Sequence, residues 1–495
     1  MNNQDFIRSS ISVSPLSIFK KHALILIQFF LIIFVYHTLK DLKDSIVITA
    51  SDAGAEVIPF IKIWAMLPIA VGASYLFAKL YNRFGREKTL YVFICLLLGA
   101  YILFAFVLYP FSSILHLSSL SEYLKSNLPS GCKGFIAMIS YWHYTFFYLM
   151  AELWSLLILS ILFWSYVNST TTLSEATKFY PLCMFVGNFA GIISGQTSHY
   201  MSQSLTEFIS WESSLQLITC IIVVCGLAIM GINRILSMSE PQKVIPLKSK
   251  KQKHSLKDNI VAIFESGPLI CIATLVVGFG ITSSLIEIVW KENIRNLYPS
   301  AQAYNAYINQ LTSMIGLMAV IMSLISRWMC QNLSWTKVAL ITPTTLFATS
   351  IFFFAALMAP AEMLAPIATF FSVSPIYLIV FFGSIHYVLG LTAKYTIFDM
   401  TKEMAFLSIE EEERIRAKSV IDSIGSRLGK SGASCLYQFL LIAFGSTSGH
   451  ISIIGISSIC MIGISILATK RLGRNLKEGD NLSEDNRIPV EALAT

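Results

Sequence analysis

The chain has 495 residues, of which 55% are hydrophobic and only 13% are charged. Its mean hydropathy of +0.65 excludes an ordinary soluble globular protein and predicts a protein that crosses a membrane many times. The formal net charge of +7 does not indicate nucleic-acid binding, because the lysines and arginines gather in short loops beside apolar runs, where they set membrane orientation.

We expect no cleavable signal sequence. The first 22 residues are polar, and the apolar run from Ala23 leads into Tyr36, His37 and Lys40 rather than into a small-residue cleavage site. The amino terminus is therefore expected to stay in the cytoplasm. The nine cysteines lie mostly in apolar runs without metal-ligand spacing, so we expect them to pack helices and expect neither a metal nor a cofactor.

About twelve apolar runs are long enough to cross ~30 Å of hydrocarbon as helices, six before a polar break and six after it. The predicted spans are Ala23 to Leu39, Val57 to Leu80, Leu90 to Tyr109, Trp142 to Val167, Tyr180 to Met201, Leu215 to Leu236, Pro268 to Trp290, Ile308 to Ser326, Val338 to Pro360, Pro375 to Phe398, Ala417 to Phe444 and Ile451 to Leu467.

This pattern predicts a cytoplasmic segment (1–22), a six-helix half (23–236), a basic linker (237–262), a second six-helix half (263–469) and a cytoplasmic tail (470–495). The linker carries six lysines, and basic residues also follow the second and twelfth spans and precede the eleventh. By the positive-inside rule these loops are cytoplasmic, so both termini are expected on that side.

Two six-helix halves joined by a basic loop are typical of transporters that bind substrate between the halves near the bilayer midplane. The end of the second span, AKLYNRFGREK, resembles the loop signature of the major facilitator superfamily, with Asn82 in place of the usual aspartate. A plain basic loop with a glycine turn is the alternative explanation of this short match. We predict an all-α, major-facilitator-like membrane protein.

Ionisable residues inside a span are costly unless they are paired or hydrated, so they are candidates for function. Glu152 is the one acid in residues 134–167, and Glu287 lies in the seventh span, one turn before Lys291. A protonated Glu152 bonding a backbone carbonyl, and a stabilising i, i+4 pair of Glu287 with Lys291, are the structural alternatives. Tyr148 lies one turn before Glu152, where its ring could stack on a flat base, or could serve packing alone.

A second group of charges follows the first span, where Lys40, Asp41, Lys43 and Asp44 precede the apolar IVITA. Lys40 and Lys43 share a helix face, and the spacing of Lys40 and Asp44 allows them to pair along the axis. A charged cap on the span is the alternative to a place in a substrate cavity.

The most unusual charges lie between Lys394 and Gln438, where Asp422, Arg427 and Lys430 belong to a helical pattern that continues into apolar sequence. Arg427 and Lys430 share a helix face and repel each other, so this face is a candidate anion site. The inward-facing ionisable set contains more cations than acids and should prefer a multiply charged anion. This set is Lys40, Lys43, Glu152, Glu287, Lys394, Arg427 and Lys430.

Several segments resemble the nucleotide transporters of the ATP/ADP translocase type found in plastids and in intracellular bacteria such as chlamydiae and rickettsiae. They are LKDLKDSIVITASDAGAEVIPFIKIW, FYLMAELWSLLILSILFW, SEATKFYPL, VGNFAGIISGQ, SSLIEIVWK, KYTIFDMTKEMAF and SRLGKSGASCLYQ. This resemblance implies a twelve-helix nucleotide transporter of the bacterial inner membrane, similar in plan to the major facilitator fold, and not an enzyme.

The resemblance also implies site residues. Lys43 in LKDLKD, Glu152 in MAELW, Glu287 in LIEIVWK and Lys430 in RLGKSG correspond to charged residues on which transport depends in the family. Asn188 in VGNFAG matches a recurring position and could bond a base or sugar, or another helix.

Departures from the family leave the substrate and the energy coupling open. Members that exchange ATP for ADP often read RDTKD, PGSGAE and EAKRFY where this chain reads LKDLKDS, SDAGAE and EATKFY. We expect ATP/ADP exchange by a monomer. The alternatives are proton-coupled symport of nucleoside triphosphates, with Glu152, Glu287 or His37 as proton carriers, or exchange of another nucleotide such as NAD. A receptor without transport is a more distant alternative.

Overall fold

The computed structural model describes residues 15–50, 53–170, 173–239, 261, 263–409, 411–445 and 451–485. All regular secondary structure in these ranges is helical, which confirms the all-α class. Most of the predicted linker (237–262), including its six lysines, and much of the predicted terminal segments lie outside the described residues.

We call α1 to α10 the N-terminal half and α12 to α20 the C-terminal half. The long helical segments of the N-terminal half are α1 (Pro15–Thr49), α2 (Val57–Phe60), η2 (Ile61–Met66), α3 (Leu67–Leu103), η3 (Phe104–Leu108), α7 (Trp142–Leu153), η5 (Trp154–Phe163), α8 (Trp164–Thr170), α9 (Leu173–Ser202) and α10 (Trp211–Ser239). Short helices join them: η1 (Gly54–Glu56), α4 (Ser112–Leu115), α5 (Ser118–Asn127), η4 (Ser130–Cys132), α6 (Lys133–Ser140) and η6 (Leu205–Glu207).

The C-terminal half repeats this style of construction. Its helical segments are α12 (Gly267–Leu297), α13 (Ala301–Asn332), α14 (Trp335–Met358), α15 (Ala361–Phe370), α16 (Pro375–Ala393), η7 (Lys394–Phe398), α17 (Asp399–Leu407), α18 (Glu411–Val420), η8 (Ile421–Gly425), α19 (Ser426–Phe444) and α20 (Ile451–Asp485). Long helices in both halves are interrupted by π-helical segments. These are η2, η5, η7 and η8.

Each of the twelve predicted runs falls on helical residues, apart from Tyr109, Ala359 and Pro360 at the ends of two runs. Nine described helical stretches are long and apolar enough to cross a membrane. One of them, Gly54–Leu108, bends at Gly85, whose φ of 76° is left-handed, and it therefore contains two of the predicted spans. Helix α1 continues past the predicted end at Leu39 to Thr49.

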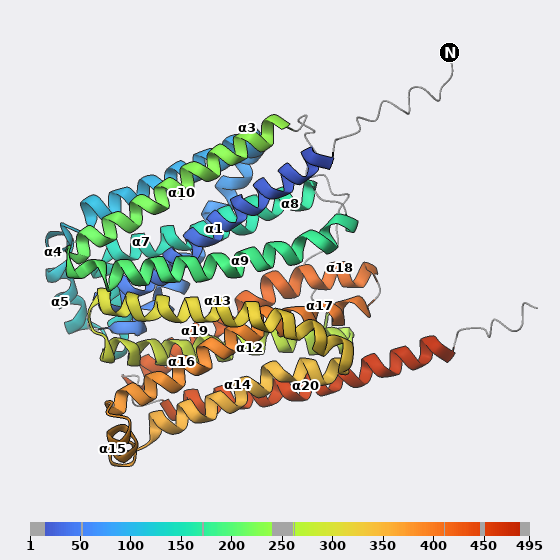
Figure 1. The fold of residues 1–495 in the computed structure, drawn as a ribbon. Helices are drawn as coiled ribbons and strands as arrows, with labels where there is room; N and C mark the ends of the chain where they lie inside the picture. The colour runs from blue at the N-terminus through green and yellow to red at the C-terminus, as the bar shows by residue number, and fades with distance from the viewer. Residues whose placement is uncertain are drawn as a thin grey trace, which may run out of the picture.

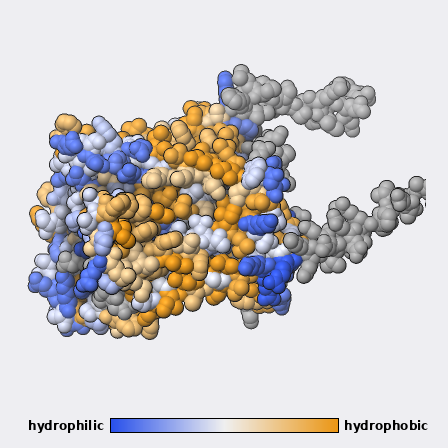
Figure 2. Space-filling view, turned by 60° about the horizontal axis from the view of Figure 1, so that its bottom comes forward, coloured by the Kyte–Doolittle hydropathy of each residue, from blue (hydrophilic) through white to orange (hydrophobic). Residues whose placement is uncertain are grey.

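Helix α1 begins and α20 ends at the same end of the bundle (Figure 1), which we call the terminal end, and the opposite end carries α4, α5 and α15 and is the distal end. The N-terminal half occupies one side of the bundle and the C-terminal half the other, with α9 and α13 side by side between them. An apolar band crosses the molecular surface between two hydrophilic ends (Figure 2), as a multi-pass membrane protein requires.

The two halves are joined in the distal part of the bundle. One hydrophobic core lies within the N-terminal half and another within the terminal end of the C-terminal half, whereas a third contains residues of both halves, among them Val47, Ile58, Leu285 and Tyr437. Small residues allow close helix approach at this junction. A Cβ atom on Gly195 of α9 would collide with the backbone of Asn309 and with Ser313 on α13.

Replacing Gly195 with alanine should therefore destabilise the protein, by about 1–3 kcal/mol if the helices must separate to admit the methyl group. Gly231→Ala is the matched control, because a Cβ at Gly231 on α10 meets no atom within 4 Å. We expect thermal unfolding in detergent to show a lower transition temperature for Gly195→Ala alone. Equal transition temperatures for the two variants would contradict the close packing of α9 on α13.

Candidate functional site

A buried cluster of charged side chains lies where the two halves meet. Lys43 on α1 donates to Asp44 Oδ1 at 2.7 Å, and its Nζ lies 3.0 Å from Glu152 Oε1 on α7. The Lys43 Nζ also lies 3.9 Å from the centre of the Tyr148 ring. Three predicted site residues of the N-terminal half are thus in direct contact.

The C-terminal half contributes a matching pair. Lys291 on α12 donates to Glu287 Oε1 at 2.5 Å, one turn earlier on the same helix, and to Asp44 Oδ2 at 2.6 Å. Asp44 therefore accepts hydrogen bonds from one lysine of each half. We call Lys43, Asp44, Glu152, Glu287 and Lys291 the central charge cluster.

Burial makes these contacts energetically important. The side chains of Lys43, Asp44 and Lys291 are 6%, 6% and 5% exposed. Removing one partner of a buried ion pair typically costs 3–5 kcal/mol, on the order of several times what an exposed pair contributes. We call the contacts of Asp44 with Lys43 and Lys291 the Asp44 bridge, which joins the two halves through buried charges.

The structure differs from the sequence-based picture of this region in one pairing. The spacing allows Lys40 to pair with Asp44, but Lys40 donates to the Tyr387 hydroxyl at 3.0 Å and lies 3.7 Å from Asp41, because Asp44 turns toward Lys43 and Lys291. Asp41, which accepts from Thr312 at 2.5 Å, and Asp44 add two carboxylates to the predicted set of inward-facing charges.

Further contacts close the distal part of the bundle around the cluster. The Ala55 N–H donates to Glu292 Oε2 at 2.7 Å, beside Gly54, whose φ of 54° is left-handed. Ser45 donates to Asn305 Oδ1 at 3.1 Å, and the Asn305 amide donates to Ser202 Oγ at 2.7 Å. Each of these bonds joins the two halves.

Arg427 and Lys430 do not belong to the central charge cluster. Both side chains are exposed on α19. Arg427, Lys430, Ser434 and Gln438 follow one another at spacings of three and four residues, so all four lie on one side of the helix. Gln438 contacts the N-terminal half, since its amide donates to Pro59 O at 2.8 Å. Arg427 and Lys430 thus face the same half, nearer the terminal end, where their side chains are uncovered.

The remaining predicted residues lie apart. Lys394 in η7 pairs with Asp399 at 3.4 Å. Asn188 on α9 is half-buried, and its backbone carbonyl lies against Gly316 of α13. The His37 ring packs on Gly191 of α9, which agrees with the helix-packing alternative for this histidine.

Sequence reasoning missed two residues of the site. Asp44 was placed near a span but not among the site residues, since its partner on α12 is 247 positions away. Lys62 lies inside the second predicted span and was overlooked, although the rule applied to Glu152 would have selected it. Its main electrostatic interactions are with Glu287, Lys291, Lys43 and Asp44.

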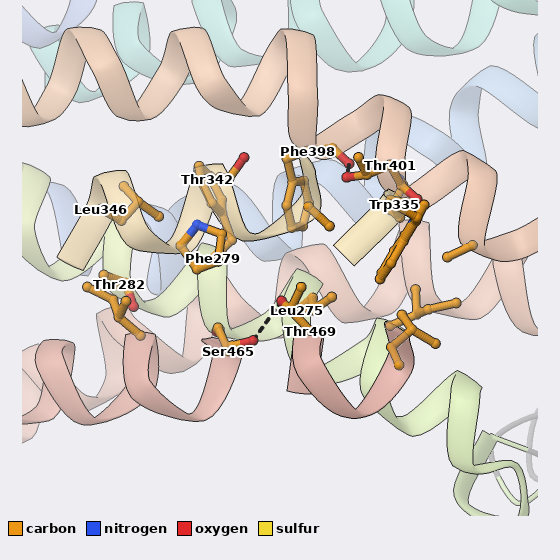
Figure 3. A pocket seen from close by; sticks show the side chains of 18 residues that line it. Leu275, Phe279, Thr282, Trp335, Thr342, Leu346, Phe398, Thr401, Ser465 and Thr469 are labelled. Carbon is orange, nitrogen blue, oxygen red and sulfur yellow. Dashed lines mark hydrogen bonds between the residues drawn. The ribbon is translucent and has the colours of Figure 1, made fainter. Parts of the chain in front are cut away.

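A half-enclosed pocket lies elsewhere, between α12, α14, α17 and α20 (Figure 3). Its lining is mainly apolar, with threonine and serine hydroxyls, as Leu275, Phe279, Thr342 and Ser465 illustrate. Lys402 is the charged residue of the lining, and it is paired with Asp422 at 2.7 Å. This pocket offers a polyanion no uncommitted cation, so we do not assign the substrate to it.

The fold is similar to that of solved transporter structures. The chain resembles a bacterial homologue of the iron transporter ferroportin in an inward-facing state, with a TM-score of 0.60, 13% identity and coverage of 93% of this chain and 99% of that one. It also resembles the nucleoside transporter NupG, with a TM-score of 0.54, 11% identity and coverage of 91% and 99%. The fold is that of a multi-pass membrane transporter of the major facilitator type.

The sequence comparisons then give the family. Residues 5–476 match the TLC ATP/ADP transporter family, and the chain belongs to it. It is 33% identical to "ADP,ATP carrier protein 2" of Chlamydia pneumoniae over 92% of this chain and 88% of that protein. It is also 33% identical to the chloroplastic "ADP,ATP carrier protein 2" of Arabidopsis thaliana, over 90% and 73%. The resemblance seen in the motifs is thus confirmed: the protein is a membrane nucleotide transporter and not an enzyme.

Proposed function

We propose that the protein exchanges ATP for ADP across a bacterial inner membrane by alternating access. The observation that carries this proposal is the Asp44 bridge, in which one buried carboxylate binds a lysine of each half. An arriving polyphosphate is a competing anion for the same lysines, so substrate binding and separation of the halves are energetically linked.

The orientation follows from the basic loops. We place the terminal end in the cytoplasm, because the positive-inside rule assigns the loops at that end to the cytoplasmic side. The conformation described here is then closed toward the outside, and the exposed side chains of Arg427 and Lys430 lie nearer the cytoplasmic end than the central charge cluster. A single chain supplies both halves of the site, which supports a monomeric transporter.

The ion pairs favour exchange over proton symport. Glu152 and Glu287 are each bound to a lysine, so each serves as a counter-ion in this conformation. A carboxylate that carries a proton would have to leave its lysine during every cycle, which costs free energy. Proton-coupled import of nucleoside triphosphates, and exchange of other nucleotides including NAD, are the competing proposals.

Uptake of labelled ATP into proteoliposomes separates these modes. Exchange requires ADP inside the vesicles, releases it in step with ATP uptake and is insensitive to a protonophore. Uptake that needs no internal nucleotide and stops with a protonophore would instead establish symport. Competition with all common nucleotides and NAD in the same assay would define the substrate range.

A further inference from the structure

Lys62 occupies an unusual place in the second span. It lies in the π-helical segment η2, between α2 and α3, and its side chain is partly exposed beside the fully buried Ile61. Single π turns inside α-helices occur frequently at functional sites, because they redirect side chains. The position therefore combines a rare backbone form with a cation inside an apolar helix.

Lys62 is also uncommitted, unlike the other lysines near it. Lys43 and Lys291 donate to carboxylates, and Lys40 donates to the Tyr387 hydroxyl. Lys62 forms no hydrogen bond or ion pair with any residue that the structure describes. A lysine inside a membrane span is costly unless it is paired or hydrated, so the unpaired and partly exposed Lys62 is open to an anionic ligand.

Charges of both signs surround Lys62. It is attracted by Glu287, Asp44 and Glu152 and repelled by Lys291 and Lys43. The attraction is weakened, because each of these carboxylates is already bound by Lys43 or Lys291. A phosphate group beside Lys62 would neutralise the charge that the protein leaves unpaired and reduce the repulsion among the three lysines.

The segment η2, which carries Lys62, lies beside α19, which carries Lys430. Helix α19 runs beside η2, because the Trp64 indole donates to Gln438 Oε1 at 3.2 Å and Gln438 donates to Pro59 O. Lys430 lies eight residues before Gln438, which is about 12 Å along the helix toward the terminal end. Lys430 therefore lies nearer the terminal end than the contact between α19 and η2.

We propose that Lys62 binds the terminal phosphate group of a nucleoside di- or triphosphate, an inference that rests on the nucleotide transport proposed above. The nucleotide enters past Arg427 and Lys430 and extends its phosphate chain toward the central charge cluster. Lys62 then distinguishes nucleotides by the length of the phosphate chain, and a nucleoside monophosphate does not reach it.

The test is equilibrium binding of ATP, ADP and AMP to the purified full chain in nanodiscs, measured by calorimetry. Lys62→Gln and Lys62→Met should weaken ATP and ADP binding about 10- to 100-fold, the loss of one charge-assisted hydrogen bond, and AMP binding by less than about threefold. Lys62→Arg should stay within about threefold of the parent, since it keeps the charge. The matched control is Lys79→Gln, an exposed lysine at the terminal end of the same helical segment.

Each other outcome counts against the proposal. Unchanged ADP affinity in both neutral variants would show that Lys62 does not contact phosphate. Equal losses of affinity for ADP and AMP would show that Lys62 does not distinguish nucleotides by the number of their phosphate groups. Failure of both neutral variants to fold would reveal a structural role. A parent protein that binds none of the three nucleotides would refute the nucleotide transport itself, before Lys62 is considered.

Discussion

Asp44→Asn is expected to open the distal part of the bundle. Without the carboxylate, Lys43 and Lys291 lose their shared counter-ion and repel each other across the junction of the two halves. The bond of Asp44 to Lys291 is the one that crosses between the halves. Losing this charge-assisted hydrogen bond, about 1.5–3 kcal/mol, shifts the equilibrium between closed and open forms about 10- to 100-fold.

A cysteine at position 202 reports this opening. Ser202 is fully buried and accepts a hydrogen bond from Asn305 of the other half, so a Ser202→Cys thiol reacts only when the halves separate. In a background lacking the nine native cysteines, Asp44→Asn should raise the rate of labelling by a water-soluble maleimide at least about tenfold.

Asp399→Asn provides the control, because it also breaks a lysine–aspartate pair, with Lys394, but within the C-terminal half. We expect it to leave the labelling of position 202 unchanged. If Asp44→Asn and Asp399→Asn label at the same rate, the Asp44 bridge does not hold the distal part closed.

The second large effect concerns the pair of Lys43 and Glu152. Lys43→Gln removes a cation whose side chain is 6% exposed. It should lower the free energy of unfolding by about 3 kcal/mol or more, because Asp44 and Glu152 lose this counter-ion. Glu152→Gln should cost less, since that side chain is 32% exposed and partly hydrated.

The double variant separates stability from function. Lys43→Gln with Glu152→Gln should be more stable than the sum of the single losses predicts, because neither charge is left without its partner. We expect Lys43→Gln, Glu152→Gln and the double variant all to lose nucleotide uptake. Additive stability losses in thermal unfolding would mean that the two residues do not interact, and uptake by the double variant would remove Lys43 from the transport mechanism.

The sequence predicted the helices well because each apolar run must satisfy its own backbone inside a bilayer. It also predicted the members of the central charge cluster that stand alone in apolar surroundings, such as Glu152 and Glu287. The cost of an isolated charge is a local property, so it can be seen without knowing the fold.

Pairings between distant segments could not be predicted in the same way. Lys40 and Asp44 are neighbours on one helix turn, yet Asp44 binds Lys291, because the junction of the halves decides the pairing. The π-helical segments were not predicted either. The bend at Gly85, by contrast, falls between two of the predicted spans. Lys62 is different, because the sequence signal was present and was missed.

The most direct test of the account is the rate of ATP/ADP exchange in proteoliposomes for Lys43→Ala and Lys430→Ala, with Lys79→Ala as control. If cations within the helices bind the phosphates of the nucleotide, the parent and Lys79→Ala will exchange labelled ATP for internal ADP. Both other variants will be slower by about tenfold or more. If Lys43→Ala or Lys430→Ala moves nucleotide as fast as the parent, that cation is not part of the binding site and the account is contradicted.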